Sequence, residues 1–391
     1  MNPAPSPPFA AFAAVWFMYF AAIGMFNPYA PLWFKELGFS TLAIGAIASL
    51  QSWTRILSPY AWGWLGDRSG QRVVIVRVAA LLCVAAASGL IFAREYAWVA
   101  FFTALLFLVN GAIVPLSEAT LAAHLNRGGE MDTARYGRVR VWGSIGFIVT
   151  VVAAGGVLQA VGIDLFPLLV TGMFGLLLVA ALRLPAARED VTRHADAPAV
   201  TTVLRRPEVA WFFASIFFTV LAHTSLYAFF SLYLDSLGYA KGTVGLLWAV
   251  SVAVEIVFFW FQGRWFGSLA PHRWLAWAAG LSVLRFAVVA WAGRHVGWLV
   301  FAQLLHAVTF AGHHAACIVL INRYFAGPLR GRGQALYSVL GYGLSGVLGG
   351  VGGGWLSSSL GFHAVFWAAV LASLAALGCV RVAERHEPAP R

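Results

Sequence analysis

Long apolar segments recur along the whole chain and alternate with short polar stretches. An α-helix of about 20 apolar residues is long enough to span the hydrocarbon core of a bilayer. The pattern therefore predicts an all-α membrane protein with both ends of the chain on the same side. Its twelve predicted transmembrane helices lie near residues 9–33, 41–64, 73–93, 97–125, 138–162, 164–183, 207–235, 241–266, 273–292, 296–325, 333–359 and 361–381.

The longest polar connection lies midway along the chain and divides the predicted helices into two sets of six. It is rich in proline, alanine and charged residues, a composition typical of a linker. We therefore predict three parts, which are an N-terminal six-helix bundle (1–183), a cytoplasmic linker (184–206) and a C-terminal six-helix bundle (207–391).

The two halves carry a common sequence pattern. The segments LWFKELGFSTLAIG (32–45) and LYLDSLGYAKGTVG (232–245) share a leucine, an LG pair before an aromatic residue, and an aliphatic residue before glycine, at a constant offset of 200 residues. Parallel repeats are typical of secondary transporters that move one half against the other around a central site. The repeat predicts pseudo-symmetric halves and a transport function.

Composition strengthens the membrane interpretation and excludes other classes. Hydrophobic residues make up 61% of the chain and charged residues 10%, whereas soluble domains carry roughly 25% charged residues. The predicted spans contain no Ser/His/Asp set and no HExxH motif, so we predict that the protein is not an enzyme.

Basic residues are distributed unevenly between the two sides of the predicted membrane. Of the 26 Lys and Arg residues, 20 fall on the side of the chain ends, with Arg140 counted there because it lies at the end of its span. Four fall on the other side, and Arg55 and Arg285 lie deep inside spans. Positive residues concentrate on the cytoplasmic side of membrane proteins. The bias predicts a multi-pass protein with both termini in the cytoplasm, and it explains the net charge of +11 without a nucleic-acid partner.

Two charged residues lie in the middle of consecutive predicted spans. Glu255, in the stretch SVAVEIVFFW, and Arg285 would each be costly at the bilayer centre if they were unpaired. An ion pair between them would satisfy both, and a carboxylate that takes up a proton for function has the same sequence pattern. Arg55 occupies the position of Glu255 in the first repeat and is a second candidate partner.

The stretch GWLGDRSGQR (63–72), between the second and third predicted spans, resembles the G-x-L-a-D-R-x-G-R/K-R/K loop of the major facilitator superfamily. The resemblance implies a fold of twelve transmembrane helices. It also implies that Asp67, Arg68 and Arg72 form a gating loop on the cytoplasmic side; an ordinary turn with basic anchors is the alternative. The second-half counterpart GRWFGSLAPHR (263–273) lacks the aspartate, which indicates an asymmetric latch.

Five further stretches resemble bacterial phenylpropionate permeases and, more loosely, lactose permease. They lie in the fourth, fifth, eighth, ninth and tenth spans and read PLSEATLAAHL, YGRVRVWGSIGF, VEIVFF, SVLRF and LLHAVTF. The resemblance implies that Glu118 and Arg140 bind substrate, that Phe147 stacks on it, and that the protein lies in a bacterial inner membrane. A helix-capping carboxylate and a lipid-facing phenylalanine are the alternatives.

The same resemblance assigns proton coupling to residues of the second half. It implies substrate or proton handling for Glu255, coupling for Arg285, and a link between substrate and proton for His306. Thr309 stands where lactose permease has a second essential glutamate. A coupled proton must therefore be carried by Glu255, Glu118 or His306.

Other polar and glycine-rich patterns lie within the spans. His223 and Tyr227, four residues apart, are predicted to face the central site, and a packed histidine is the alternative. His313 and Cys317 have a helical metal-ligand spacing without carboxylate partners, so we predict no metal site. The glycine-rich stretch GVLGGVGGGW (346–355) predicts close packing between helices and bending during transport.

The charges assigned to the central site favour an anionic substrate held by Arg55, Glu118 and Arg140. Three arginines outnumber two glutamates there, and a monocarboxylate would neutralise the surplus by pairing bidentately with an arginine. We predict a proton-coupled importer of a small organic carboxylate, with aromatic acids as candidates, which uses no cofactor besides the proton gradient and works as a monomer. A sugar or nucleoside symporter, an efflux pump for hydrophobic compounds, and a non-transporting sensor or scaffold are the alternatives.

Overall fold

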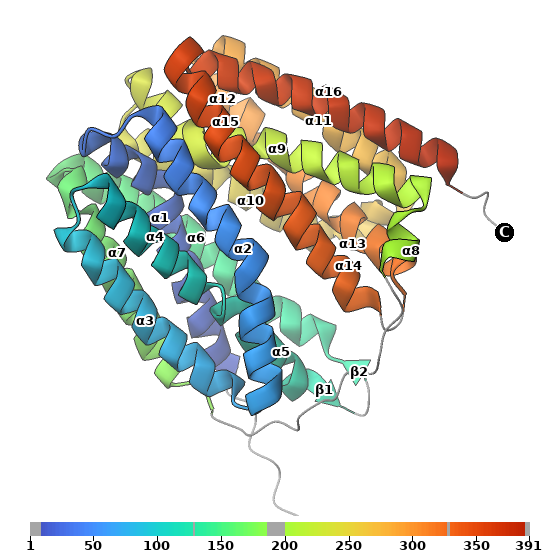
Figure 1. Cartoon of the computed structure of the whole chain (residues 1–391), viewed down its shortest axis with the longest axis horizontal. Helices are drawn as coiled ribbons and strands as arrows, with labels where there is room; N and C mark the ends of the chain where they lie inside the picture. The colour runs from blue at the N-terminus through green and yellow to red at the C-terminus, as the bar shows by residue number, and fades with distance from the viewer. Residues whose placement is uncertain (1–8, 128–129, 186–199, 327–328, 388–391) are drawn as a thin grey trace, which may run out of the picture. The chain divides into compact units, whose positions relative to one another are not determined.

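The computed structural model describes residues 9–127, 130–185, 200–326 and 329–387, which fold almost entirely into helices (Figure 1). The helices before the central connection are α1 (Phe9–Glu36), α2 (Thr41–Ser69), α3 (Arg72–Phe92), α4 (Tyr96–Asn110), α5 (Ile113–Leu125), α6 (Thr133–Val161) and α7 (Phe166–Leu182). A two-residue antiparallel ladder between α5 and α6 is formed by β1 (Asn126–Arg127) and β2 (Glu130–Met131). The helices after the connection are α8 (Thr201–Leu204), α9 (Pro207–Ser236), α10 (Lys241–Trp265), α11 (Pro271–Ala292), α12 (Val296–Leu304), α13 (His313–Tyr324), α14 (Arg330–Leu336), α15 (Ser345–Leu360) and α16 (Phe362–His386).

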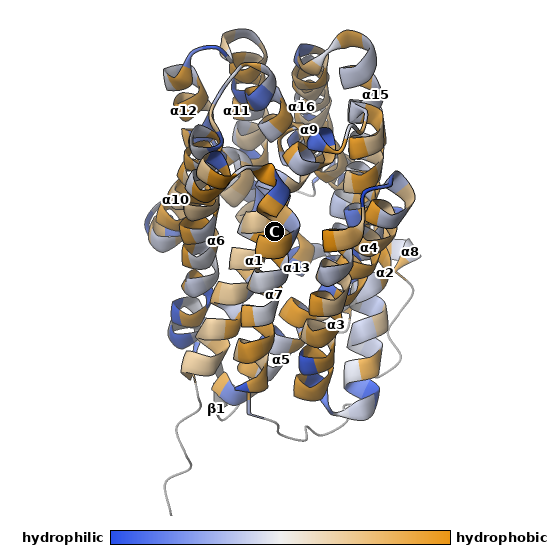
Figure 2. Ribbon diagram, turned by 90° about the vertical axis from the view of Figure 1, so that its left-hand side faces the viewer, coloured by the Kyte–Doolittle hydropathy of each residue, from blue (hydrophilic) through white to orange (hydrophobic). Residues whose placement is uncertain are grey.

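Eleven helical segments of the described chain are long and apolar enough to cross a bilayer. They correspond to all the predicted spans except the second, and hydrophobic residues dominate the ribbons in Figure 2. α2 is 29 residues long but less apolar, because Gln51 and Arg55 lie in its middle. The predicted all-α membrane fold is confirmed with these eleven spans, whereas the twelfth span and the pseudo-symmetry of the halves stay predictions.

Contacts group the chain into two compact units. The first unit comprises residues up to Leu37 and from Leu57 to Arg193, and the second comprises Gly38–Ile56 and residues from His194 onward. The first part of α2 therefore belongs to the second unit. The predicted linker at 184–206 lies mostly outside the described residues, and the division of the chain at this linker stays a prediction.

Within the first unit, α1 packs along α6 and α7, and α3 packs against α4 and α7. Gly24 permits the close approach of α1 to α6, since a Cβ on it would lie 2.8 Å from the carbonyl oxygen of Phe147. Tyr29 donates a hydrogen bond of 2.7 Å to the carbonyl oxygen of Val151 on the same side of α6. These contacts fix the side of α6 that faces α1, and with it the position of Arg140.

Within the second unit, α9 packs against α15 and α16, and α11 packs against α16. The glycines of α15 lie against the first part of α2. Gly350 and Gly45 are so close that a Cβ on either would clash with the carbonyl oxygen of the other. The hydroxyl of Thr41 also donates to the carbonyl oxygen of Gly354 at 3.5 Å. The close packing predicted from the glycine-rich stretch is therefore confirmed.

Two π-helical turns interrupt the helices of the second unit. η3 (Ala307–Gly312) joins α12 to α13, and η5 (Tyr337–Leu344) joins α14 to α15. Such turns are rare and occur frequently at functional sites. η3 begins directly after His306, contains Thr309 and packs against α10 and α11. The irregular turn therefore lies among the residues to which the sequence assigns proton coupling.

Candidate functional site

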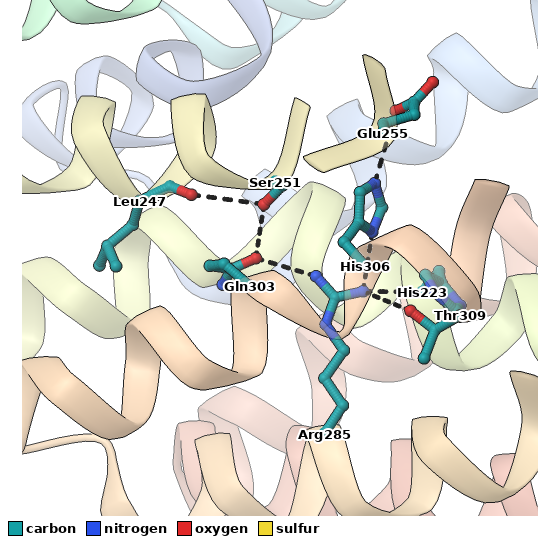
Figure 3. A network of polar contacts seen from close by, with 8 residues as sticks. All are labelled: His223, Leu247, Ser251, Glu255, Arg285, Gln303, His306 and Thr309. Carbon is teal, nitrogen blue, oxygen red and sulfur yellow. Dashed lines mark hydrogen bonds and ion pairs between the residues drawn. The ribbon is translucent and has the colours of Figure 1, made fainter. Parts of the chain in front are cut away.

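Arg285 is the centre of a buried hydrogen-bond network in the second unit (Figure 3). It lies on α11 with 1% of its surface exposed. Its Nη1 donates to Oγ1 of Thr309 at 3.1 Å and to Nδ1 of His306 at 2.9 Å. Its Nη2 donates to Oε1 of Gln303 at 2.9 Å. The guanidinium is thus held by neutral acceptors from α12 and from the turn that follows it.

The ring of His306 lies between Arg285 and Glu255 (Figure 3). Because a guanidinium only donates hydrogen bonds, Nδ1 of His306 is the acceptor, and the neutral ring carries its proton on Nε2. Nε2 lies 3.8 Å from Oε2 of Glu255 on α10. Carboxylate, imidazole and guanidinium therefore follow one another, with the imidazole proton on the side of the carboxylate.

Glu255 and Arg285 do not form the direct ion pair that was one of the two alternatives for these residues. Among the described residues no carboxylate lies within ion-pairing distance of Arg285, because the His306 ring occupies the space between the two charges. Thr309 contributes a hydroxyl to the guanidinium. The buried cation is therefore stabilised by neutral dipoles, which bond to Nη1 and Nη2 without cancelling its charge.

His223 and Tyr227 lie on α9 beside this network. Nδ1 of His223 donates to the carbonyl oxygen of Thr219 at 2.8 Å, which leaves Nε2 as an acceptor 3.5 Å from Nη1 of Arg285. The ring of Tyr227 stacks on that of Trp248, with centroids 6.4 Å apart. The structure places His223 against Arg285, and the substrate-binding roles of both residues stay predictions.

Two buried polar residues of the network were missed by the sequence analysis. Oε1 of Gln303 accepts a second hydrogen bond, of 2.6 Å, from the hydroxyl of Ser251 on α10. Ser251 lies one helical turn before Glu255, and Gln303 lies one turn before His306. Polar residues one turn from a site residue, inside an otherwise apolar span, are the signal that could have found them.

Arg140, on α6, is an arginine of the first unit with quite different surroundings. Its guanidinium carbon lies 4.8 Å from the ring centroid of Trp16 and 4.9 Å from that of Phe20, both on α1. In the part of the chain that the structure describes, no acceptor for its N–H groups is present. Cation–π attraction holds the guanidinium on the two rings and leaves its in-plane donors available.

Glu118 and Phe147 are also placed in the first unit. The carboxylate of Glu118, on α5, accepts a hydrogen bond from the hydroxyl of Tyr136 on α6, and it forms no ion pair with Arg140 within the described ranges. Phe147 is buried, and its backbone packs against Gly24 of α1. The predicted roles of Glu118 and Phe147 in substrate binding stay predictions.

Arg55 lies in the part of α2 that belongs to the second unit, and its side chain is exposed. The next residue, Ile56, packs against Gly343 of η5. Glu118 and Arg140 belong to the first unit. The three residues predicted to hold the substrate are thus divided between the two units, and their action on a common substrate stays a prediction.

The predicted gating loop is largely helical. α2 continues through the motif, and the turn comes at Gly70, whose φ of 63° favours glycine. Asp67 forms an ion pair of 2.8 Å with Arg72, and the guanidinium of Arg68 lies 5.2 Å from the ring centroid of Trp64. The ion pair links α2 to α3 within the first unit, while the gating role of these residues stays a prediction.

His313, His314 and Cys317 of α13 make separate contacts. Sγ of Cys317 lies 3.6 Å from Nε2 of His313, and Nδ1 of His314 lies 2.9 Å from the hydroxyl of Tyr337. Among the residues described, no group of three His, Cys, Asp or Glu side chains is arranged to hold a metal ion. The contacts are those of packed, hydrogen-bonded side chains.

The sequence matches the model of the MFS_1 like family over residues 9–368. The chain belongs to this family. It is therefore a multi-pass membrane transporter of the major facilitator superfamily and not an enzyme. The superfamily inferred from the loop motif is thereby confirmed.

Two relatives match nearly the whole of this MFS chain. A protein named probable 3-phenylpropionic acid transporter, from Escherichia coli (strain K12), is 28% identical over 367 residues, which are 93% of this chain and 94% of the relative. A maltose permease from Geobacillus stearothermophilus is 27% identical over 370 residues, which are 91% of this chain and 89% of the relative. The resemblance to phenylpropionate permeases is thus confirmed across the chain.

Solved transporter structures share the fold of this MFS protein. A mutant of the nucleoside transporter NupG superimposes with a TM-score of 0.84 at 15% identity, covering 97% of this chain and 99% of that one. A POT family transporter in complex with 5-aminolevulinic acid superimposes with a TM-score of 0.76 at 11% identity, covering 97% of this chain and 96% of that one. At these identities the likeness establishes the fold alone.

Proposed function

We propose that this transporter is a proton-coupled symporter of a small organic carboxylate, with aromatic monocarboxylates as the preferred class. The observation that carries the proposal is the guanidinium of Arg140, which lies on two aromatic rings and has no acceptor among the described residues. A cation within a membrane helix is costly unless its donors are satisfied. An anionic substrate supplies both the acceptors and the opposite charge.

The rings beside Arg140 favour a carboxylate that carries an aromatic group. Trp16 and Phe20 stack with centroids 6.0 Å apart, and both lie under the guanidinium. A carboxylate binds the edge of a guanidinium through two parallel N–H···O bonds. Trp16 is buried beneath the guanidinium, whereas Phe20 is partly exposed and offers apolar area and ring contacts to a phenyl group on the acid. The 3-phenylpropionic acid transporter among the relatives supports the same substrate class.

Glu255 is the proton carrier in this proposal. His306 is a poor site for the proton, because a second proton on its ring would occupy Nδ1, which accepts the bond from Arg285. It would also place two cations side by side. Glu255 is partly exposed and faces the Nε2 proton of His306. Protonation of Glu255 removes its negative charge, weakens its attraction to the ring and so alters the network around Arg285.

Alternating access by two six-helix halves is the architecture that we propose for this cycle, in a protein that functions as a monomer. α2 is 29 residues long, or about 43 Å at 1.5 Å per residue, which is enough for it to cross the bilayer as a twelfth span. With twelve spans, both termini lie on one side. The distribution of basic residues favours the cytoplasmic side of a bacterial plasma membrane.

A proton-coupled sugar symporter is the second candidate. The maltose permease relative favours it, and so does Glu118, whose carboxylate already accepts a hydrogen bond from the hydroxyl of Tyr136. A neutral sugar would, however, leave the charge of Arg140 without an anion in the membrane. The surroundings of Arg140 therefore favour the carboxylate.

Uptake by the purified protein in proteoliposomes tests the proposal. Labelled 3-phenylpropionate and labelled maltose are supplied separately, with and without an inward proton gradient, and protein-free liposomes measure the passive entry of the neutral acid. We expect the carboxylate alone to accumulate above the passive level, and only with the gradient. Gradient-driven accumulation of maltose but not of the carboxylate would contradict the proposed substrate, and carboxylate uptake that ignores the gradient would contradict proton coupling.

A further inference from the structure

We propose that Gln303 is a positioning residue of the coupling centre, where it fixes the orientation of the Arg285 guanidinium. Ser251 acts with it. The orientation of the guanidinium in turn decides which ring nitrogen of His306 carries the proton. The inference rests on the proposed proton coupling and adds two residues to which the sequence motifs assign no role.

Oε1 of Gln303 bridges α10 and α11. It accepts a hydrogen bond of 2.9 Å from Nη2 of Arg285 and one of 2.6 Å from the hydroxyl of Ser251. All three side chains are at least nine-tenths buried, with exposed fractions of 4% or less. Because a guanidinium only donates, the amide oxygen must face Nη2 of Arg285. A flipped amide would place Nε2, a second donor, against that nitrogen.

This contact fixes the rest of the guanidinium, because the group is rigid and planar. With Nη2 on Gln303, Nη1 faces Nδ1 of His306 and Oγ1 of Thr309. Without the amide acceptor, the Arg285 side chain would be free to turn away from Nδ1. The imidazole proton would then be shared between both ring nitrogens, although only Nε2 faces Glu255.

The acceptor at position 303 is neutral, and this preserves the charge of the network. The groups around Arg285 are an amide, a hydroxyl and two imidazoles. A carboxylate in place of the amide would form an ion pair with the guanidinium and would cancel its charge. With neutral acceptors only, protonation of Glu255 decides whether the network is neutral or positive. This is the property that a charge-coupled switch needs.

The network is also incompletely bonded. Nε2 of Gln303 and Nε of Arg285 are buried and have no acceptor among the described residues. Buried donors without acceptors cost free energy. Two such donors in one network favour a centre that exchanges hydrogen bonds during transport over a purely structural cluster.

Two substitutions separate a positioning role from a structural one. Gln303→Met keeps the approximate volume and removes the acceptor, whereas Gln303→Glu keeps the shape and adds a negative charge. Gln262, near the end of α10, receives the same two substitutions as a matched control. Each variant is measured for gradient-driven accumulation of labelled 3-phenylpropionate, for exchange at equal pH, and for the pH profile of uptake.

The expected results differ between the two variants. Gln303→Met reduces accumulation by about tenfold and changes exchange by about threefold or less, since coupling is lost while binding remains. Gln303→Glu raises the pH midpoint of uptake by about half a unit or more, because a neutralised guanidinium opposes proton uptake by the network less strongly. Ser251→Ala weakens accumulation by about threefold, through one lost hydrogen bond. The Gln262 variants retain wild-type behaviour.

Unchanged accumulation in Gln303→Met, or an unchanged pH midpoint in Gln303→Glu, overturns the positioning role. If Gln303→Met does not insert into the membrane, the midpoint of Gln303→Glu decides. The wild-type protein, measured in parallel, tests the proposed function separately. Its failure to accumulate the carboxylate contradicts that function, whereas variants that match an active wild type contradict only the role of Gln303.

Discussion

Arg140 and Arg285 are both arginines within membrane helices, yet their surroundings are opposite. Arg285 is almost completely buried, and its donors bond to neutral side chains. Arg140 is partly exposed, lies on the faces of Trp16 and Phe20, and has no acceptor among the described residues. The chain itself supplies acceptors for most of the donors of Arg285, whereas Arg140 needs an acceptor from outside the described residues.

The difference is compatible with the two tasks that we propose for one residue type. An arginine whose donors are already bonded responds to changes in its neighbours, so Arg285 suits coupling. An arginine with oriented but available donors binds a planar anion, so Arg140 suits substrate recognition. Substitutions around Arg285 should therefore change gradient-driven accumulation, whereas substitutions around Arg140 should change the affinity for substrate.

Substitution of Glu255 by Gln has the largest expected effect. The amide keeps a polar oxygen facing Nε2 of His306, but the side chain can no longer take up a proton. We expect gradient-driven accumulation to fall to the level of protein-free liposomes, while exchange at equal pH persists. Both are measured with labelled 3-phenylpropionate. Unchanged accumulation would show that the carboxylate of Glu255 is structural.

Substitution of Arg140 by Lys is expected to raise the KM for the carboxylate by about tenfold to a hundredfold, because lysine cannot form the bidentate pair. The ratio of accumulation with the gradient to that without it should be retained at saturating substrate. Arg285→Lys is the matched control, with the opposite result expected: a KM within about threefold of wild type and lost accumulation. If both variants show the same pattern, the division of tasks is wrong.

Substitution of Phe20 by Leu tests the aromatic support of Arg140. The substitution removes one of the two rings that contact the guanidinium, which is partly exposed to solvent. We expect the KM for the carboxylate to rise by about two- to fivefold. Phe17→Leu is the control, since the ring of Phe17 lies 6.4 Å from that of Trp142 instead. Initial uptake rates over a range of 3-phenylpropionate concentrations provide the KM of each variant. Equal effects of the two substitutions would contradict a specific role of Phe20.

Substitution of Tyr136 by Phe has the smallest expected effect. It removes the hydroxyl that donates to the carboxylate of Glu118, and this partly exposed carboxylate can be hydrated in its place. We expect KM to rise by about two- to threefold, without a change in proton dependence. A loss of gradient-driven accumulation in the same transport assay would instead assign Glu118, rather than Glu255, to proton uptake.

The positions of the helices and the family could be predicted from the sequence, and most contacts of the site could not. The segment predicted at 207–235 is α9, Pro207–Ser236, and the one predicted at 273–292 is α11, Pro271–Ala292. Glu255 and Arg285 were found because charges are rare in apolar spans. Gln303 and Trp16 were not found, since a glutamine or a tryptophan in a span is compatible with many roles until its neighbours are known.

The pairing of charges shows the same limit. The sequence places Glu255 and Arg285 at similar depths but contains no information on what lies between them. His306 occupies that space at the residue directly before the π-helical turn η3, and the sequence did not predict that turn. Proximity in depth was therefore predictable, and the order of groups in the network was not.

The sequence by itself determined that this protein is a membrane transporter of the major facilitator superfamily, where most of its spans lie, and which charged residues those spans contain. Hydropathy acts through the sum of residues along one helix, so these properties need no knowledge of other helices. Only the tertiary structure decided that Arg285 is held by Gln303, His306 and Thr309, and that Arg140 rests on aromatic rings. Such contacts depend on how each helix is rotated about its axis and on which helices lie beside it. Side-chain packing between helices fixes both.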